Sequence, residues 1–264
     1  MEQSHETVIE VRNLTAGYHG AVVLDRLNFD VQSGEVFVIL GGSGCGKSTL
    51  LKHMIGLYPP MDGAVRFRGQ DIVTSWGEER LAILRQFGVM YQQGALFGSM
   101  NVLDNVRLPL VEFTKLPDSA TELIARMKLG LVGLAAFAEH MPEELSGGMK
   151  KRAAIARAMA LDPSILFLDE PSAGLDPITS AELDRLVLHL SRDLGITFVI
   201  VTHELPSIFA IADRVIMLDK RTRGIIAEGD PARLRDESKH PWVHQFFHRE
   251  AAAIGAGPGT EAES

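Results

Sequence analysis

The stretch VFVILGGSGCGKSTLLKHMIGL, residues 36–57, decides the fold. It opens with five apolar residues, Val36–Leu40, and such a run before glycines is typical of a buried strand. GGSGCGKS, Gly41–Ser48, then matches the phosphate-binding pattern G-x-x-x-x-G-K-[ST]. The residues after it have helical spacing up to Tyr58-Pro59-Pro60. The strand, loop and helix together predict a phosphate-binding loop (P-loop) on an α/β core.

The residue types in this loop fit nucleotide phosphates and a magnesium ion. Glycines let main-chain N–H groups wrap phosphates without Cβ clashes, and the helix N-terminus adds partial positive charge. Lys47 is expected to reach the β- and γ-phosphates, and the Ser48 hydroxyl is expected to ligate Mg²⁺. The predicted contacts come from Gly41, Gly42, Ser43, Gly44, Cys45, Gly46, Lys47, Ser48 and Thr49.

An acidic pair supplies the second part of such a site. In ILFLDEP, Ile165–Pro171, four apolar residues bury a strand and deliver Asp169 to its carboxyl end. Asp169 is expected to hold Mg²⁺ through water, and Glu170 to orient or activate the attacking water. An Asp-Glu pair at a strand end is often only the start of a solvated loop, but its combination with a P-loop favours the catalytic interpretation.

The remaining periodicities predict alternating strands and helices with a helical insert, hence a parallel sheet in an α/β fold. The expected strands are Val8–Val11, Val31–Val36 (after a turn at Asp25–Asn28), Gly63–Gly69 with its turn, Phe87–Tyr91, Ile165–Leu168, Thr197–Val201, and a closing hairpin of Val215–Leu218 and Ile225–Glu228. The expected helices are Glu78–Gln86, Ser180–Leu194 and a helical region from Val102 to Leu161 with breaks at Pro109, Pro117 and Pro142.

Composition narrows the class of protein. A net charge of −8 argues against a nucleic-acid surface, which needs clustered Lys and Arg. No stretch reads as a signal peptide or a membrane span. The single cysteine, Cys45, forms no internal disulfide, which favours a reducing compartment. Because Cys45 lies in the P-loop, a bulky alkyl group there is expected to collide with the phosphates and inhibit the protein.

The C-terminal region changes character after residue 240. Trp242, Phe246 and Phe247 fall on one helical face, which predicts packing on the core, with a docking patch for a partner as the alternative. After Arg249 the chain is rich in Ala and Gly, and disorder is expected there.

The stretch ELSGGMKKR, Glu144–Arg152, contains the LSGG signature, and with the P-loop and DEP it resembles the ATP-binding subunits of ABC transporters. The resemblance covers about Val8–Trp242. It implies a RecA-like P-loop NTPase core with an antiparallel β subdomain, an ATP-binding domain over 8–240 with its helical insert at about 100–160, and a tail over 241–264. It also implies ATP as the nucleotide and a head-to-tail homodimer. There Ser146, Gly147 and Gly148 would close over the γ-phosphate on the partner's P-loop.

Other family positions carry over one at a time. Tyr18, in LTAGYHG, resembles the aromatic residue that stacks on adenine, although a surface aromatic in a turn is the alternative. Gln92 matches the glutamine that meets Mg²⁺ or water and senses the membrane partner, and Gln93 is its neighbouring alternative. Asp176, at the end of SAGLD, matches the acidic residue of a loop at the dimer interface. His203, in IVTHEL, matches the histidine that contacts the γ-phosphate, whereas a lone histidine at a strand end is usually structural.

Methionine after the signature glycines, together with QQGALFGSMNV, resembles the Mla/Mce branch of intermembrane lipid transport ATPases. This likeness implies that the chain energises a separate permease that moves phospholipids between inner and outer membranes. The implied partners are an MlaE-type integral-membrane permease, an MlaD-type MCE-domain protein and an MlaB-type STAS-domain protein. The implied location is the cytoplasmic face of the inner membrane, peripheral, through the permease. Four apolar residues are expected either at the permease interface or in the core of the helical insert: Leu96, Phe97, Met100 and Val102.

Two other functions fit the same motifs. One is the ATPase of an importer for a polar solute such as an amino acid or a metal, because the ATP chemistry would be identical. The other is a soluble ABC ATPase without a transport role, against which the acidic charge weighs. The chain also departs from the best-known members of the branch, because the segment after Arg249 is short, so their long C-terminal contact with a partner subunit is not carried over.

Overall fold

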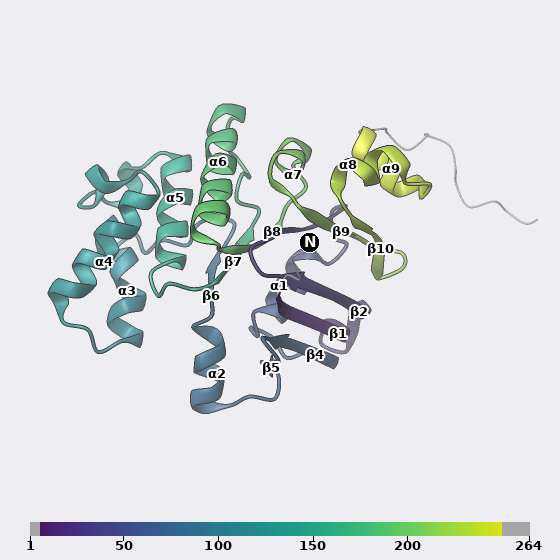
Figure 1. Cartoon of the computed structure of the whole chain (residues 1–264), viewed down its shortest axis with the longest axis horizontal. Coiled ribbons are helices and arrows are strands. Elements are labelled where there is room, and N and C mark those ends of the chain that lie inside the picture. The colour runs from purple at the N-terminus through teal and green to yellow at the C-terminus, as the bar shows by residue number, and fades with distance from the viewer. Residues whose placement is uncertain (1–5, 250–264) are drawn as a thin grey trace, which may run out of the picture.

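The computed structural model describes residues 6–249, and a six-stranded sheet forms its centre, in the order β10-β9-β3-β8-β7-β6 (Figure 1). Five strands run parallel and β10 closes the edge as an antiparallel hairpin with β9. The bounds are β3 Val36–Gly41, β6 Phe87–Met90, β7 Ile165–Asp169, β8 Thr197–Val201, β9 Arg214–Asp219 and β10 Gly224–Gly229. The predicted α/β class and the predicted parallel sheet are confirmed.

The central strands are apolar on both faces because the sheet has a hydrophobic core on each side. Val36, Val38 and Leu40 of β3 enter one core, which holds mainly helical side chains. Phe37 and Ile39 enter the other core, beneath the second sheet and helix α1. Side chains alternate along a strand, so a continuous apolar run fills both cores at once.

A second, antiparallel sheet covers one face of the central sheet, in the order β2-β1-β4-β5. Its strands are β1 Thr7–Tyr18, β2 Ala21–Gln32, β4 Asp62–Phe67 and β5 Gln70–Asp71. Helix α1, Lys47–Met54, lies between the two sheets and buries Leu50, Leu51 and Met54 there. The P-loop helix is therefore held by both sheets.

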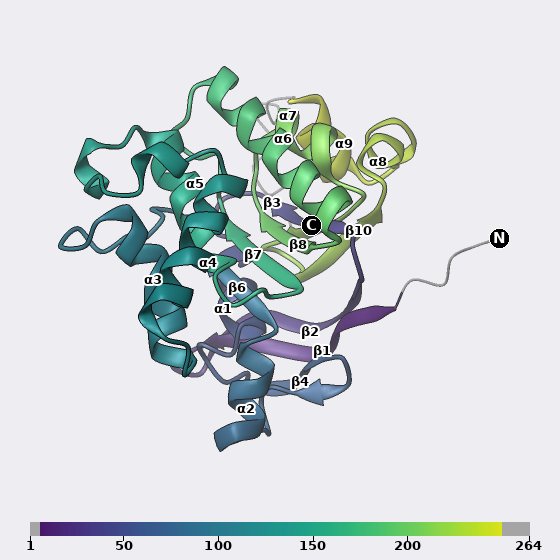
Figure 2. The same ribbon diagram turned by 60° about the vertical axis from the view of Figure 1, so that its left-hand side comes forward.

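The helical insert stands to one side of the sheets, with α3, α4 and α5 adjacent in both ribbon views (Figures 1 and 2). These helices span α3 Val102–Phe113, α4 Asp118–Leu131 and α5 Gly147–Ala158, with single 3₁₀ turns at Ala135–Phe137 and Pro142–Glu144. The other helices are α2 Gly77–Leu84, α6 Pro177–Leu194, α7 Leu205–Ile211, α8 Pro231–Glu237 and α9 Pro241–His248. Within residues 6–249, no helix combines the length and apolarity needed to cross a membrane.

The N-terminal hairpin differs from its prediction. Residues 31–36 are not one strand, because β2 ends at Gln32, β3 begins at Val36, and a turn separates them. The segment Asp25–Asn28 is not a turn but lies inside β2, and the hairpin instead reverses at His19-Gly20. The Asp/Asn-rich segment forms a bulge, because the Asn28 side chain accepts from the Asn13 N–H at 2.9 Å and replaces a ladder bond.

The expected break at Pro109 is also wrong, since α3 runs through it from Val102 to Phe113. A proline inside a helix removes one hydrogen bond and costs about 3 kcal/mol. Val102, Val106 and Leu110 are buried on the inner face of α3 and offset that cost. Packing therefore overrides the local signal, whereas Pro117 does mark the start of α4.

The prediction that the aromatic residues of the C-terminal helix pack on the core is confirmed. Val243 and Phe247 are buried in the core of the helical side, and Trp242 and Phe246 pack against it. The predicted disorder after Arg249 concerns residues 250–264, which lie outside the described residues.

Candidate functional site

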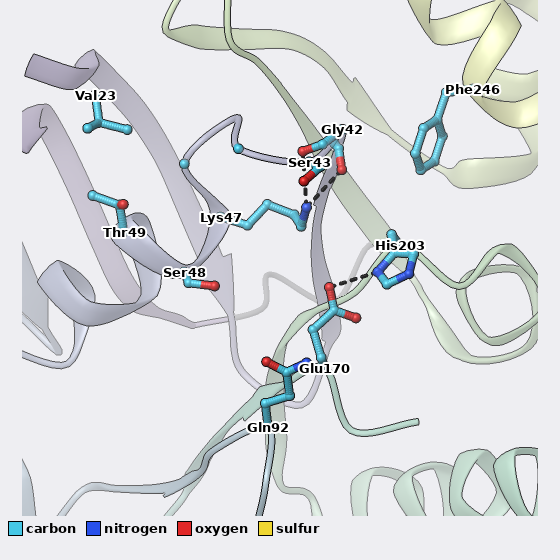
Figure 3. Close-up of a pocket in the computed structure, with 13 residues that line it drawn as sticks. Val23, Gly42, Ser43, Lys47, Ser48, Thr49, Gln92, Glu170, His203 and Phe246 are labelled. Carbon is cyan, nitrogen blue, oxygen red and sulfur yellow. Dashed lines mark hydrogen bonds and ion pairs between the residues drawn. The ribbon is translucent and has the colours of Figure 1, made fainter. Parts of the chain in front are cut away.

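The carboxyl ends of the parallel strands gather the predicted site residues at one edge of the sheet. The P-loop follows β3, Glu170 follows β7, and Gln92 and His203 come two residues after β6 and β8. These residues line one cavity of about 760 Å³ (Figure 3). Of the predicted P-loop contacts, Gly41, Gly42, Ser43, Gly44, Gly46, Lys47, Ser48 and Thr49 line it.

Two glycines of the loop are required by their backbone geometry. Gly46 has φ = 106°, and a Cβ there would come within 2.7 Å of Leu24. Gly41 has φ = 147°, and a Cβ there would lie 2.5 Å from the Leu218 carbonyl oxygen. Residues with a side chain rarely adopt these backbone conformations, so glycine is needed for the loop to turn tightly between β3 and α1.

Lys47 and Cys45 point in different directions from the same loop. Lys47 Nζ donates to the carbonyl oxygens of Gly41 at 2.9 Å and Gly42 at 3.2 Å, which holds the ammonium inside the loop. Cys45 is 3% exposed and packs into the core beneath the loop. Burial raises the pKa of its thiol above the ordinary value, opposed by the charge of Lys47. Cys45 is the one predicted P-loop contact that does not line the cavity in the described residues, and the predicted inhibition by alkylation stays a prediction.

Glu170 and His203 form a pair across the end of the sheet. His203 Nδ1 donates to Glu170 Oε1 at 2.9 Å. Glu170 has φ = 47°, a left-handed conformation that is uncommon outside glycine, and its N–H donates to the Val201 carbonyl at 2.8 Å. This turn directs the carboxylate into the cavity (Figure 3).

Asp169 is the last residue of β7, directly before Glu170. Burial, reinforced by the charge of Glu170, raises the pKa of Asp169, whereas Lys52, Lys151 and Lys47 act against the rise. Among the described residues, Asp169 Oδ1 and Glu170 Oε2 are buried and have no hydrogen-bond partner. Two buried carboxylate oxygens without donors are an arrangement that a cation would satisfy.

Lys151 is a site residue that the sequence reasoning missed. It is 7% exposed, and its Nζ donates to the main-chain carbonyls of Gln92 and, at 3.4 Å, of Glu170. Burial lowers the pKa of its ammonium, and the charges of Asp169 and Glu170 oppose that change. The sequence around Lys151 could not have predicted these contacts, because its partners are main-chain atoms of residues far away in the chain.

The signature residues begin helix α5 and lie outside the P-loop cavity. Ser146 caps α5 by accepting from the Met149 N–H at 3.3 Å. Gly148 is needed for close packing on α6, since a Cβ there would come within 2.4 Å of Thr179 Cγ2. Gly147 lines a separate cavity of about 390 Å³ together with Gln92 and Gln93. Only Gln92 of the two glutamines also lines the P-loop cavity.

Tyr18 and Asp176 occupy defined places away from the P-loop cavity. The Tyr18 ring lies 5.3 Å from that of Tyr58, edge to face, and 5.9 Å from that of His53. Asp176 is the N-cap of α6 and accepts from the N–H groups of Ile178 and Thr179, both at 3.0 Å. A side-chain hydrogen bond from Thr179 lowers the pKa of Asp176. Their proposed contacts with adenine and with a second subunit stay predictions.

Val23 and Phe246 complete the described cavity lining. Val23 comes from β2 and Phe246 from α9, on opposite sides of the loop in Figure 3. The sequence predicted that Phe246 packs on the core, but no sequence pattern indicated that it also lines the P-loop cavity.

Comparison with known proteins extends this picture beyond the site. The profile of the ABC transporter family matches residues 24–173. The intermembrane phospholipid transport system ATP-binding protein MlaF of Haemophilus influenzae is 40% identical over 94% of this chain and 92% of its own length. MlaF of Escherichia coli is 39% identical over 94% of this chain and 91% of its own length. The probable ribonucleotide transport ATP-binding protein mkl of Mycobacterium leprae is 40% identical over 94% of this chain and 71% of its own length.

Solved structures agree. The structure of cbiO1 from Clostridium perfringens, part of the ABC transporter complex cbiONQ, matches with a TM-score of 0.80 at 31% identity, over 88% of this chain and 92% of that one. The dimeric ATP-binding cassette MJ0796, bound to ADP and Pi, matches with a TM-score of 0.75 at 30% identity, over 84% of this chain and 98% of that one. These similarities extend far beyond the P-loop, so the chain belongs to the ABC transporter family, as one of its ATPase subunits.

Proposed function

We propose that Glu170 is the catalytic base of ATP hydrolysis at the P-loop cavity. The observation that carries this proposal is its carboxylate, which is turned into the cavity and held by His203 Nδ1 at 2.9 Å. A carboxylate in this position can accept a proton from water that attacks the γ-phosphate. Lys47 and the main-chain N–H groups of the loop would bind the phosphates, and His203 would contact the γ-phosphate through Nε2.

Mg²⁺ fits the residues around this cavity. Ser48 and Gln92 line the cavity, and Asp169, directly before the cavity-lining Glu170, has a buried Oδ1 without a donor among the described residues. Oxygen ligands of this kind suit Mg²⁺, directly or through water. When bound, the ion would neutralise charge on the β- and γ-phosphates. Tyr18 would stack on the adenine from the end of β1.

A second copy of the chain would complete each site. Ser146, Gly147 and Gly148 do not line the P-loop cavity in the described residues. Ser146 and Gly147 are exposed at the start of α5, whose N–H groups are suited to phosphate, whereas Gly148 is buried against α6. A head-to-tail homodimer would bring this helix start of one subunit to the P-loop of the other. Asp176 would lie at the interface, and ATP binding would close the dimer.

We infer that the transported substrate is a phospholipid. Both MlaF proteins are named for intermembrane phospholipid transport and match along more than nine tenths of their length. The partners would be an integral-membrane permease of the MlaE type, an MCE-domain protein of the MlaD type and a STAS-domain protein of the MlaB type. Through the permease the chain would be bound to the cytoplasmic face of the inner membrane. Phe97, 50% exposed after Gln92, offers an apolar contact to that permease, whereas Val102 is core.

A polar solute is the second candidate, because mkl, named for ribonucleotide transport, is equally similar at 40% identity. The test is affinity purification of this chain from solubilised native membranes, followed by mass spectrometry of proteins and lipids. Co-purification of a permease, an MCE-domain protein and phospholipid is the expected result. A permease accompanied by a solute-binding protein would instead support the polar solute, and no membrane partner would refute a transport role.

A further inference from the structure

Helix α9 brings an aromatic side chain to the P-loop. The Phe246 ring comes from Pro241–His248, close to the end of the described chain, yet it lines the same cavity as Lys47, Glu170 and His203. In Figure 3 its ring lies on the side of Gly42 and His203, across the cavity from Val23. We propose that Phe246 is a nucleotide-contacting residue that walls the phosphate end of the cavity, a role that rests on the nucleotide site proposed above.

The helix is fixed to the loop by a second aromatic residue. A Cβ built on Gly42 would come within 3.2 Å of Trp242 Cζ2, so the indole edge packs directly on the loop. Trp242 precedes Phe246 by four residues, and side chains at this spacing share one helix face. One face of α9 therefore packs on the P-loop at Gly42 through Trp242 and lines the cavity through Phe246.

The opposite side of α9 is anchored in the core. Val243 is fully buried and Phe247 is 5% exposed. The Phe247 ring lies 5.7 Å from that of Phe209 in α7, the helix that begins two residues after His203. Phe246 and Phe247 meet edge to face with centroids 5.6 Å apart. These contacts hold the Phe246 ring against the cavity in a fixed position.

An aromatic wall affects phosphate binding through water. A ring at the rim displaces water from the phosphates and lowers the local dielectric constant, which strengthens their attraction to Lys47. It also makes the position sensitive to the sign of any charge placed there. A carboxylate at 246 would repel the phosphates and an ammonium would attract them.

The experiment compares Phe246→Asp with Phe246→Lys in the full-length chain. Both variants remove the ring and place a charge on α9, so damage to the fold affects both alike. The dissociation constants of a non-hydrolysable ATP analogue and of ADP are measured at low and high salt. We expect Phe246→Asp to bind the analogue at least about tenfold more weakly than Phe246→Lys. The ratio of the two dissociation constants should be smaller for ADP than for the analogue, and smaller at high salt than at low salt.

The matched control is the pair Phe113→Asp and Phe113→Lys on α3. Phe113 is 49% exposed and lies outside the P-loop cavity, so this pair measures the effect of net charge alone. Its two members are expected to differ by less than about twofold. Equal affinities of Phe246→Asp and Phe246→Lys would overturn the proposal. So would a difference in affinity between them no larger than the difference within the control pair.

A milder variant covers the case in which charged residues at 246 prevent folding. Phe246→Leu keeps an apolar side chain without the ring and is expected to weaken binding of the analogue several-fold at a nearly unchanged Tm. Unchanged affinity in that variant refutes the contact. Wild-type protein that binds no ATP would refute the nucleotide site itself, a result distinct from wild-type binding with variants that do not differ.

Discussion

Glu170 and His203 are joined by a hydrogen bond of 2.9 Å from His203 Nδ1 to Glu170 Oε1. The two residues follow neighbouring parallel strands, β7 and β8. The left-handed backbone of Glu170 is held by its N–H bond to Val201, so the carboxylate position is set by the sheet rather than by a mobile loop. The imidazole holds Oε1, and Oε2 is buried without a hydrogen-bond partner among the described residues.

The first prediction is that Glu170→Gln binds ATP but turns it over about 10²–10⁴-fold more slowly, because the amide cannot accept the proton from water. Its carbonyl oxygen still accepts from His203, so the geometry is kept. Steady-state ATPase assays and equilibrium ATP binding measure the two effects. Glu204→Gln, at a carboxylate 3.7 Å from His203 Nε2, is the control and should act far more weakly. Normal turnover by Glu170→Gln would refute the catalytic assignment.

Lys151→Met should destabilise the protein by about 1–3 kcal/mol, because it leaves the carbonyls of Gln92 and Glu170 without their buried donor. Turnover should fall as well, since both carbonyls belong to segments that line the cavity. Thermal unfolding and ATPase rates give the two readouts. Lys150→Met, at a half-buried neighbour, is the matched control. Equal stability of the two variants would contradict the role of the Lys151 contacts.

Gly42→Ala should weaken ATP binding because its new Cβ presses on Trp242 at 3.2 Å. Trp242→Leu should relieve that pressure. The double variant should therefore bind ATP more tightly than the sum of the two single-variant losses in binding free energy predicts. Gly41→Ala provides the contrast, because its Cβ would meet the main chain at 2.5 Å and no change at Trp242 can relieve it. Strictly additive losses for Gly42→Ala and Trp242→Leu would argue against packing between α9 and the loop.

Alkylation of Cys45 should be slow in the folded protein. The thiol is 3% exposed, and burial raises its pKa, so little reactive thiolate is present at neutral pH. We expect labelling on the order of 100-fold slower than in denaturant, with a rate that rises as the pH approaches the raised pKa. Mass spectrometry gives a clean readout because the chain has a single cysteine. Equal rates in native and denatured protein would show that the thiol is accessible.

Asp176→Ala should lower Tm at neutral pH by about a few degrees through loss of the α6 cap. The pKa of Asp176 is lowered in the folded protein, mainly by the Thr179 hydroxyl, so its ionised form is favoured there. This stabilisation is present above the ordinary value of 3.8 and is lost as the pH falls through the lowered value. The Tm difference between wild type and variant should therefore stay constant from pH 7 down to about pH 4 and shrink only as the pH falls below 3.8. A Tm difference that does not depend on pH would contradict the charged cap.

The sequence alone determined the parts of this protein that depend on local pattern. The run Val36–Leu40, the glycines that follow and the apolar strand before Asp169 specified a P-loop on a parallel sheet. The acidic pair after a buried strand was expected to join the P-loop in one site, and the family resemblance added Gln92 and His203. Gln92, Glu170 and His203 do line one cavity with the P-loop.

Only the tertiary structure decided which side chains approach that cavity from elsewhere and which leave it. The Asp25–Asn28 segment has turn residues, yet pairing with β1 makes it a bulged strand, and packing carries α3 through Pro109. Cys45 turns into the core, Lys151 reaches two distant carbonyls, and Phe246 arrives from α9. Such contacts join residues far apart in the chain, and no local periodicity encodes them, because they depend on how whole elements pack against one another.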